Sequence, residues 1–233
     1  MSYNKILDND INTIKKELIF LVEATKSQYA RTFNALKNKD YELAKRVVAE
    51  DLRINDLQNK FTSMALWKIA KQQMVAGDLR LAVGGILISK EIERIADVAK
   101  HICTFTVKYK PVTLEIDYIS RMFDLVNEML NIVSALIENY DDDQNEKVAN
   151  MEKQLNSQFS DLSLKLAERL FETKDQGEAK KIITIIRQLK NLERAGEHLI
   201  NIDETLEFIR TGKFEEYGES VENKLEESKN KKD

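Results

Sequence analysis

The sequence has few residues that interrupt helices and few that favour a sheet. Its 233 residues include 1 proline and 7 glycines, and aromatic side chains make up 7% of the chain. Because residues with high helix propensity dominate the remainder, the composition favours an all-α protein. A chain of this length suits one large or two small domains, and either arrangement can bury a hydrophobic core.

A secretion signal, a membrane span and a disulfide framework are also missing. The single cysteine, Cys103, excludes an internal disulfide and fits a reducing compartment, where we expect a buried, inert thiol. The first ten residues, MSYNKILDND, lack the basic and apolar regions of a signal peptide. No run of about 18 apolar residues free of charge occurs. We therefore expect a cytoplasmic protein that reaches a membrane only through a partner.

The chain has no surplus of basic residues. It contains 36 Lys and Arg against 40 Asp and Glu, with a net charge of −4. A general nucleic-acid-binding protein usually carries a positive excess, so we expect no nucleic-acid partner.

Apolar residues recur at steps of three and four, as in Ile14, Leu18 and Leu21. This period is typical of helices that pack lengthwise at shallow angles. Sparse turn signals separate the periodic segments. Among them, Gly77 is the expected end of one helix and Asp78 the expected N-cap of the next. The predicted helices cover residues 3–36, 40–73, 78–107, 113–140, 145–172 and 178–210.

One charged motif occurs twice in this chain. The two copies are KEIERIADVAKHI at residues 90–102 and KNLERAGEHLINI at residues 190–202. Pro111 lies between them, after the third predicted helix. We therefore predict two tandem, pseudo-symmetric three-helix bundles, related so that Glu93 maps onto Glu193. The predicted bundles cover residues 1–109 and 112–211, and a polar tail covers residues 212–233.

Each predicted bundle carries four side chains with oxygen ligands on two neighbouring helices, spaced i, i+4 on a flank beside the apolar stripe. The two sets are Asp51, Asn55, Glu93 and Asp97 in the first bundle, and Glu152, Asn156, Glu193 and Glu197 in the second. If the two helices are antiparallel neighbours, several oxygen atoms can reach common cations. His101 extends the first row by one turn, and imidazole favours iron and zinc over magnesium.

A solvated helix face is the alternative, since i, i+4 carboxylates are common in a chain with 40 acidic residues. Like charges at this spacing cost a few tenths of a kcal/mol, however, so their repetition in both halves favours a ligand role. For His101 the alternative is an ordinary exposed histidine, and His198, off the row, is expected at the surface. Phe20, Trp67 and Phe123 are expected in the core or in a bundle contact.

The duplicated motif resembles the signature of the PhoU family of phosphate-signalling proteins, roughly Leu-Glu-Arg-Ile-Gly-Asp-His-Ala. The surrounding segments resemble that family as well: ALKNKDYELAKRVV at 35–48, VVAEDLRINDL at 47–57 and KQQMVAGDLRLAVGGILISKEIERIAD at 71–97. The resemblance covers about residues 5–210. Some positions depart from the family pattern: Asn55 and Asn156 stand where the family usually has Asp, Glu197 replaces Asp, and His101 replaces a usual Asn. Fewer charged ligands weaken the case for a highly charged metal cluster.

The resemblance implies a six-helix regulator of high-affinity phosphate uptake rather than an enzyme. It implies two partners, the ATPase of the phosphate ABC transporter and, in many bacteria, a phosphate-responsive sensor histidine kinase. It also implies iron or zinc on the acidic motifs, and we expect a homodimer. The candidates for partner contact are Arg94 and Arg194, one in each motif copy, and Arg80 in the segment before the first copy, because a guanidinium can bind a carboxylate through two hydrogen bonds.

Other functions are less well supported. A carboxylate-bridged di-iron oxidase needs Glu-x-x-His on two helices, but Val98 and Ala195 stand three residues before His101 and His198. A hydrolase lacks a phosphate-binding glycine loop and a Ser/His/Asp arrangement. A PhoU-related partner of a different phosphate transporter and a purely structural or metal-binding bundle stay open.

Overall fold

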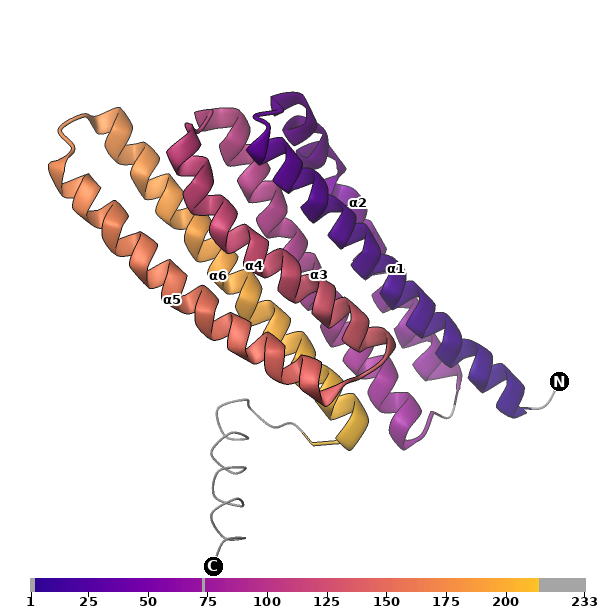
Figure 1. Cartoon of the computed structure of the whole chain (residues 1–233). Coiled ribbons are helices and arrows are strands. Elements are labelled where there is room, and N and C mark those ends of the chain that lie inside the picture. The colour runs from indigo at the N-terminus through magenta and orange to yellow at the C-terminus, as the bar shows by residue number, and fades with distance from the viewer. Residues whose placement is uncertain (1–2, 73, 214–233) are drawn as a thin grey trace, which may run out of the picture.

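The structure is a computed structural model that describes residues 3–72 and 74–213. All the regular secondary structure in these residues is helical (Figure 1). This confirms the all-α prediction and the six-helix count for that part of the chain. Most of the predicted tail lies outside the described residues. The helices are α1 (Tyr3–Lys37), α2 (Tyr41–Lys71), α3 (Ala76–Tyr109), α4 (Thr113–Glu138), α5 (Asp142–Glu172) and α6 (Gln176–Thr211).

Side-chain caps set several helix ends. Asp40, Asp141 and Asp175 precede α2, α5 and α6, and each accepts a hydrogen bond from a backbone N–H two or three residues later. Such caps satisfy amides that have no partner inside the helix. At the other end of α6, Gly212 takes the left-handed conformation, with φ 82°, that ends many helices.

The predicted start of α3 is wrong. The helix begins at Ala76 after Val75, so Gly77 and Asp78 lie inside its first turn. Glycine tolerates this position, and the Asp78 carboxylate is favourable near the positive end of the helix dipole. The start of α5 also lies three residues earlier than predicted, at Asp142, because the preceding aspartate caps it.

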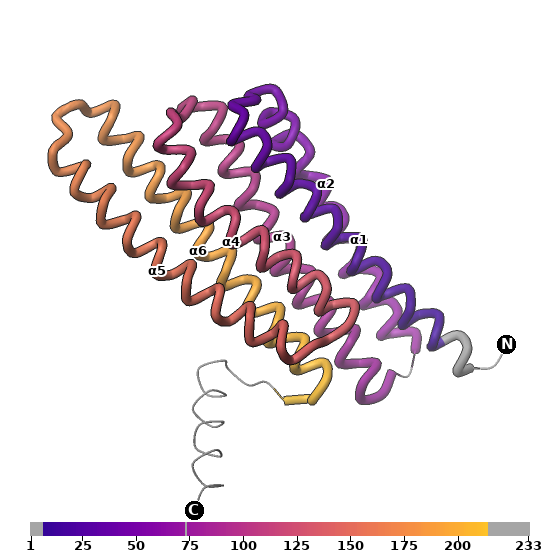
Figure 2. The backbone as a smooth tube through the Cα atoms, viewed as in Figure 1, coloured from indigo at the N-terminus to yellow at the C-terminus, as the bar shows by residue number. Residues whose placement is uncertain are grey.

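The six helices run lengthwise beside one another in an elongated array (Figure 2). Helices α1, α2 and α3 contact one another, as do α4, α5 and α6, which confirms the two three-helix bundles. The bundles join where α3 packs along α6 and α1 along α4. One continuous cluster of buried apolar side chains runs through both halves. The molecule is therefore two repeats around a shared core. None of the described helices combines the length and the apolar character of a membrane span.

Phe123 of α4 is the aromatic centre of the junction between the halves. Its ring centroid lies 5.0 Å from that of Tyr29 and 5.3 Å from that of Phe33, both on α1. The Tyr29 hydroxyl donates a hydrogen bond to the carbonyl of Ile95 on α3 at 3.0 Å, so all three helices meet here. Cys103 is buried as predicted, and burial raises the pKa of its thiol to about 11.

The expectation that Phe20 and Trp67 serve the core is wrong. Their exposed fractions are 49% and 57%, whereas Phe123 is fully buried. Trp67 instead lies under the ammonium of Lys71, 4.5 Å from the ring centroid. At about 100° of turn per residue, both residues point away from the buried stripes of their helices, which run through Leu18 and Leu21 on α1 and through Ala65 and Lys68 on α2.

Replacing Phe123 with alanine should destabilise the whole protein. A buried Phe→Ala change costs about 3–5 kcal/mol, because apolar contact is lost and a cavity stays behind. The free energy of unfolding, measured by urea titration, should fall by that amount. The matched control is Phe171→Ala, since Phe171 is almost fully exposed and its loss should change stability by less than about 0.5 kcal/mol. Equal effects of the two changes would contradict this account of the junction.

Candidate functional site

The two copies of the charged motif occupy equivalent places on α3 and α6. Ile92 and Leu192 are both fully buried. Glu93 and Glu193, one residue later, each have side chains 13% exposed and each contact a lysine three residues before them. The repeat in the sequence is therefore a repeat in space.

The two copies also lie against each other, which the sequence analysis did not foresee. Glu91 of α3 faces α6, where His198 Nδ1 lies 2.7 Å from its Oε2 and Asn201 Nδ2 donates to the same oxygen at 3.2 Å. Toward the other end of α6, a Cβ added at Gly84 would lie 2.6 Å from Ile209, so the helices approach closely there too. The expectation of a surface role for His198 is wrong, because this ring is largely buried against Glu91.

A groove between the two motif copies has a volume of about 320 Å³. We call it the inter-repeat groove. Arg94 and Arg194 both line it, and Arg94 also pairs with Glu91 at 2.8 Å. In the described part of the chain, no ion pair or side-chain hydrogen bond engages Arg194. The full lining is Arg94, Asp97, Val98, His101, Asn191, Arg194 and His198.

Arg80 lies apart from that pair. Its Nε donates to the carbonyl of Ile209 at 3.2 Å, and its guanidinium lies against Gly212. It therefore ties α3 to the last turn of α6. Of the three arginines predicted to contact a partner, the structure brings Arg94 and Arg194 together and assigns Arg80 an intramolecular contact.

In the first acidic set a lysine lies between the carboxylates. Lys100 Nζ is 2.8 Å from Asp51 Oδ2 and 2.6 Å from Asp97 Oδ1. Gln28 Nε2 approaches the other oxygen of Asp51 at 3.5 Å. Burial would lower the pKa of Lys100, but the hydrogen bonds to Asp51 and Asp97 outweigh it and leave the pKa raised. The Asp51 side chain is 4% exposed, so it lies in the bundle and not on an open flank.

The other members of the first set do not join this cluster. Glu93 pairs with Lys90 at 2.5 Å, Asn55 is half-buried, and His101 is exposed at the inter-repeat groove. The structure therefore brings together Asp51 and Asp97 alone, with an ammonium between them.

The second set is linked differently. Asn156 Nδ2 donates to Glu152 Oε1 at 2.6 Å, within α5. The Lys190 ammonium lies against Glu193 on α6 and is 4.0 Å from Glu197. The amide oxygen of Asn156 is buried, and no hydrogen bond from the described residues reaches it.

Neither set is arranged as a metal centre. In residues 3–72 and 74–213, no group of three or more His, Cys, Asp or Glu side chains could hold a metal ion. Lysine ammonium groups contact the carboxylates that a metal would need, so the residues as placed do not fit an iron or zinc centre. Metal binding at these sets stays a prediction.

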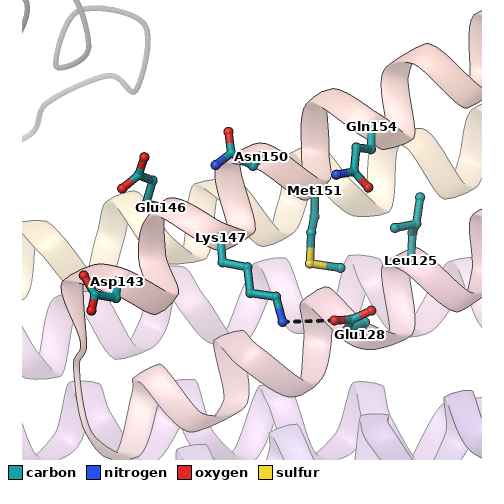
Figure 3. Close-up of a pocket in the computed structure, with 8 residues that line it drawn as sticks. All are labelled: Leu125, Glu128, Asp143, Glu146, Lys147, Asn150, Met151 and Gln154. Carbon is teal, nitrogen blue, oxygen red and sulfur yellow. Dashed lines mark hydrogen bonds and ion pairs between the residues drawn. The ribbon is translucent and has the colours of Figure 1, made fainter.

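A hollow between α4 and α5 is a weaker candidate for function (Figure 3). Across it, Lys147 Nζ of α5 lies 3.1 Å from Glu128 Oε1 of α4, with Met151 beside the pair. The lining contains no histidine, arginine, cysteine or hydroxyl side chain. The inter-repeat groove therefore has the stronger claim to recognition.

The ionised Glu91 should make stability depend on pH in the acid range. Burial would raise the pKa of Glu91, but hydrogen bonds from His198 and Asn201 outweigh it and hold the pKa below its usual 4.5. The resulting stabilisation is complete above the unfolded-state pKa and is lost as pH falls through the lower folded-state value. Between about pH 5 and about pH 3, Glu91→Gln should therefore lose less free energy of unfolding than the parent.

Urea titrations across this range measure the difference. The control is Glu146→Gln, because Glu146 is exposed and takes part in no ion pair of the described residues. Its curve should run parallel to that of the parent. If Glu91→Gln runs parallel as well, the contact with His198 and Asn201 contributes nothing.

Comparison with known proteins gives a consistent result. The profile of the PhoU domain matches residues 18–106 and 119–206. A phosphate-specific transport system accessory protein PhoU homolog from Caulobacter vibrioides (strain NA1000 / CB15N) is 31% identical over 192 residues, covering 80% of this chain and 81% of the relative. The phosphate-specific transport system accessory protein PhoU of Escherichia coli (strain K12) is 25% identical over 211 residues, with 87% and 84% covered.

Solved structures show the same fold. The crystal structure of PhoU from Pseudomonas aeruginosa matches with a TM-score of 0.81 at 22% identity, covering 88% of this chain and 99% of that one. The phosphate transport system regulatory protein PhoU from Streptococcus pneumoniae matches with a TM-score of 0.79 at 19% identity, with 90% and 99% covered.

Proposed function

This chain belongs to the PhoU family, and on that premise we propose that it is a non-enzymatic regulator of phosphate uptake and phosphate-responsive signalling. Curated relatives that span most of its length are named accessory proteins of the phosphate-specific transport system. The proposed partner is the ATPase of the phosphate ABC transporter, with a phosphate sensor histidine kinase as a second partner. Because that ATPase works at the cytoplasmic face of the membrane, the proposal places this protein in the cytoplasm.

The inter-repeat groove carries the proposal of an adaptor. Arg94 and Arg194 come from equivalent positions of two rigid helices and point to one groove. A guanidinium is planar, always charged and able to bind a carboxylate through two hydrogen bonds. Within residues 3–72 and 74–213 Arg194 has no ion pair to break, so its guanidinium is available to an acidic side chain of the partner.

The same groove supports a binding role over catalysis. Its lining contains no serine, cysteine, threonine or lysine, and of its two histidines His198 is engaged by Glu91. It also lacks the Glu-x-x-His pairs of a di-iron centre. A partner from a different phosphate transporter would use the same arginines, so the choice of partner is decided by binding measurements.

Replacing both groove arginines should weaken partner binding. In Arg94→Ala/Arg194→Ala the carboxylates of the partner lose two charged donors near the centre of the interface, where truncations cost about 2 kcal/mol or more. Titration with the purified transporter ATPase at physiological salt should show a dissociation constant raised at least about tenfold. The thermal midpoint should stay close to that of the parent, because both side chains are exposed.

The matched control is Arg121→Ala/Arg187→Ala, which removes two exposed arginines of α4 and α6 that do not line the groove. This control should bind as the parent does. Unchanged binding by the groove variant would show that the inter-repeat groove is not the partner-binding surface. If both variants weaken binding equally, the loss of affinity comes from the change in net charge and not from the groove.

A homodimer is the final part of the proposal. Helix α2 exposes Leu52, Leu66 and Trp67, and α1 exposes Phe20. Exposed apolar groups that gather on one side of a protein often mark an interface. Sedimentation velocity should show a species of twice the chain mass that Trp67→Lys/Leu66→Lys converts to monomer. A parent that sediments as a monomer at every concentration would eliminate this assembly.

A further inference from the structure

Lys100 occupies the position where a cation would bind in the first acidic set. Its ammonium contacts Asp51 on α2 and Asp97 on α3, at 2.8 and 2.6 Å. Gln28 of α1 adds a longer approach to Asp51, so three helices meet at this point. These are charge-assisted contacts of the short, strong kind.

The second repeat has no counterpart to this lysine. The position equivalent to Lys100 is Ile200, an apolar residue. The other lysine of the motif occurs in both repeats, because Lys90 contacts Glu93 as Lys190 contacts Glu193. One additional ammonium therefore distinguishes the first set from the second.

We propose that Lys100 is an internal cation that takes the place of a metal ion in the first repeat. A metal ion at Asp51 and Asp97 would have to break both contacts of Lys100. It would also place its charge beside a tethered ammonium, and like charges at close range repel strongly where burial reduces screening. The inference concerns metals alone and is independent of the proposed partner.

Two properties follow from the internal cation. The junction of α1, α2 and α3 is held by a group that cannot dissociate from the chain, so it does not respond to metal supply. In the second repeat the Lys190 ammonium contacts Glu193 and lies 4.0 Å from Glu197, while Glu152 accepts a hydrogen bond from Asn156. The two repeats are similar in fold but differ in how their acids are neutralised.

The experiment counts Mn²⁺ bound to the full chain by electron paramagnetic resonance of the free ion. Mn²⁺ suits oxygen ligands and keeps its oxidation state during a titration. The second set is first silenced by Glu193→Gln/Glu197→Gln. In that background, the chain with Lys100 should bind no specific Mn²⁺. Adding Lys100→Met should create one Mn²⁺ site per chain, with a dissociation constant at least tenfold below that of any residual binding by the background. Mn²⁺ should then raise the thermal midpoint of this variant.

Two further variants keep the result decisive. Lys100→Gln removes the charge but leaves an amide that can donate to Asp51, so it preserves the fold if Lys100→Met does not. Lys90→Met is the control, because it removes an ammonium from Glu93 and leaves Lys100 in place; it should gain no Mn²⁺. Mn²⁺-dependent refolding of an otherwise unfolded Lys100→Met chain would support the proposal.

Two outcomes overturn it. The first is Mn²⁺ bound to the silenced background that still contains Lys100, at a site that Asp51→Asn abolishes. The second is a folded Lys100→Gln or Lys100→Met chain that binds no more Mn²⁺ than its parent.

Discussion

The antiparallel packing of α3 against α6 is the contact on which the rest of the molecule depends. Because the two helices carry the two copies of one motif, their contact brings equivalent residues together across a local twofold relation. It places Arg94 and Arg194 at one groove and seats Glu91 beside His198. The buried faces of both helices belong to the same apolar cluster, so the geometry of the groove is fixed by the core.

Charge is distributed unevenly on this symmetric frame. On α3, the Lys100 ammonium contacts two aspartates. Glu91 contacts Arg94 of the same helix and His198 of α6. On α6, Arg194 is left without an internal partner in the described residues. Duplication supplied two similar scaffolds, and single substitutions such as Lys100 against Ile200 made their surfaces different.

Local patterns in the sequence were enough for the helices and the repeat. The stripes through Ile92 and Leu192 fix which face is buried, and the motif spacing fixes the duplication. Contacts between residues far apart in sequence were not available from such patterns: Glu91 meets His198 across 107 positions, and nothing near either residue indicates the other. The role of Lys100 was not predictable for a related reason. A lysine three residues after an aspartate usually forms an exposed ion pair, and here only the contact with the buried Asp51 on another helix distinguishes it.

The close approach of α3 to α6 has a consequence for the order of events during synthesis. Helix α3 leaves the ribosome about 100 residues before α6 is complete, which at about 5–20 residues per second is a wait on the order of 5–20 s. Throughout that interval the first repeat has no cover for the face around Gly84, where Ile209 later packs. A first repeat that folds before α6 is complete would expose this apolar face to solvent. Chaperone binding, or pairing with another unfinished chain, would then compete with the packing of α6 on that face.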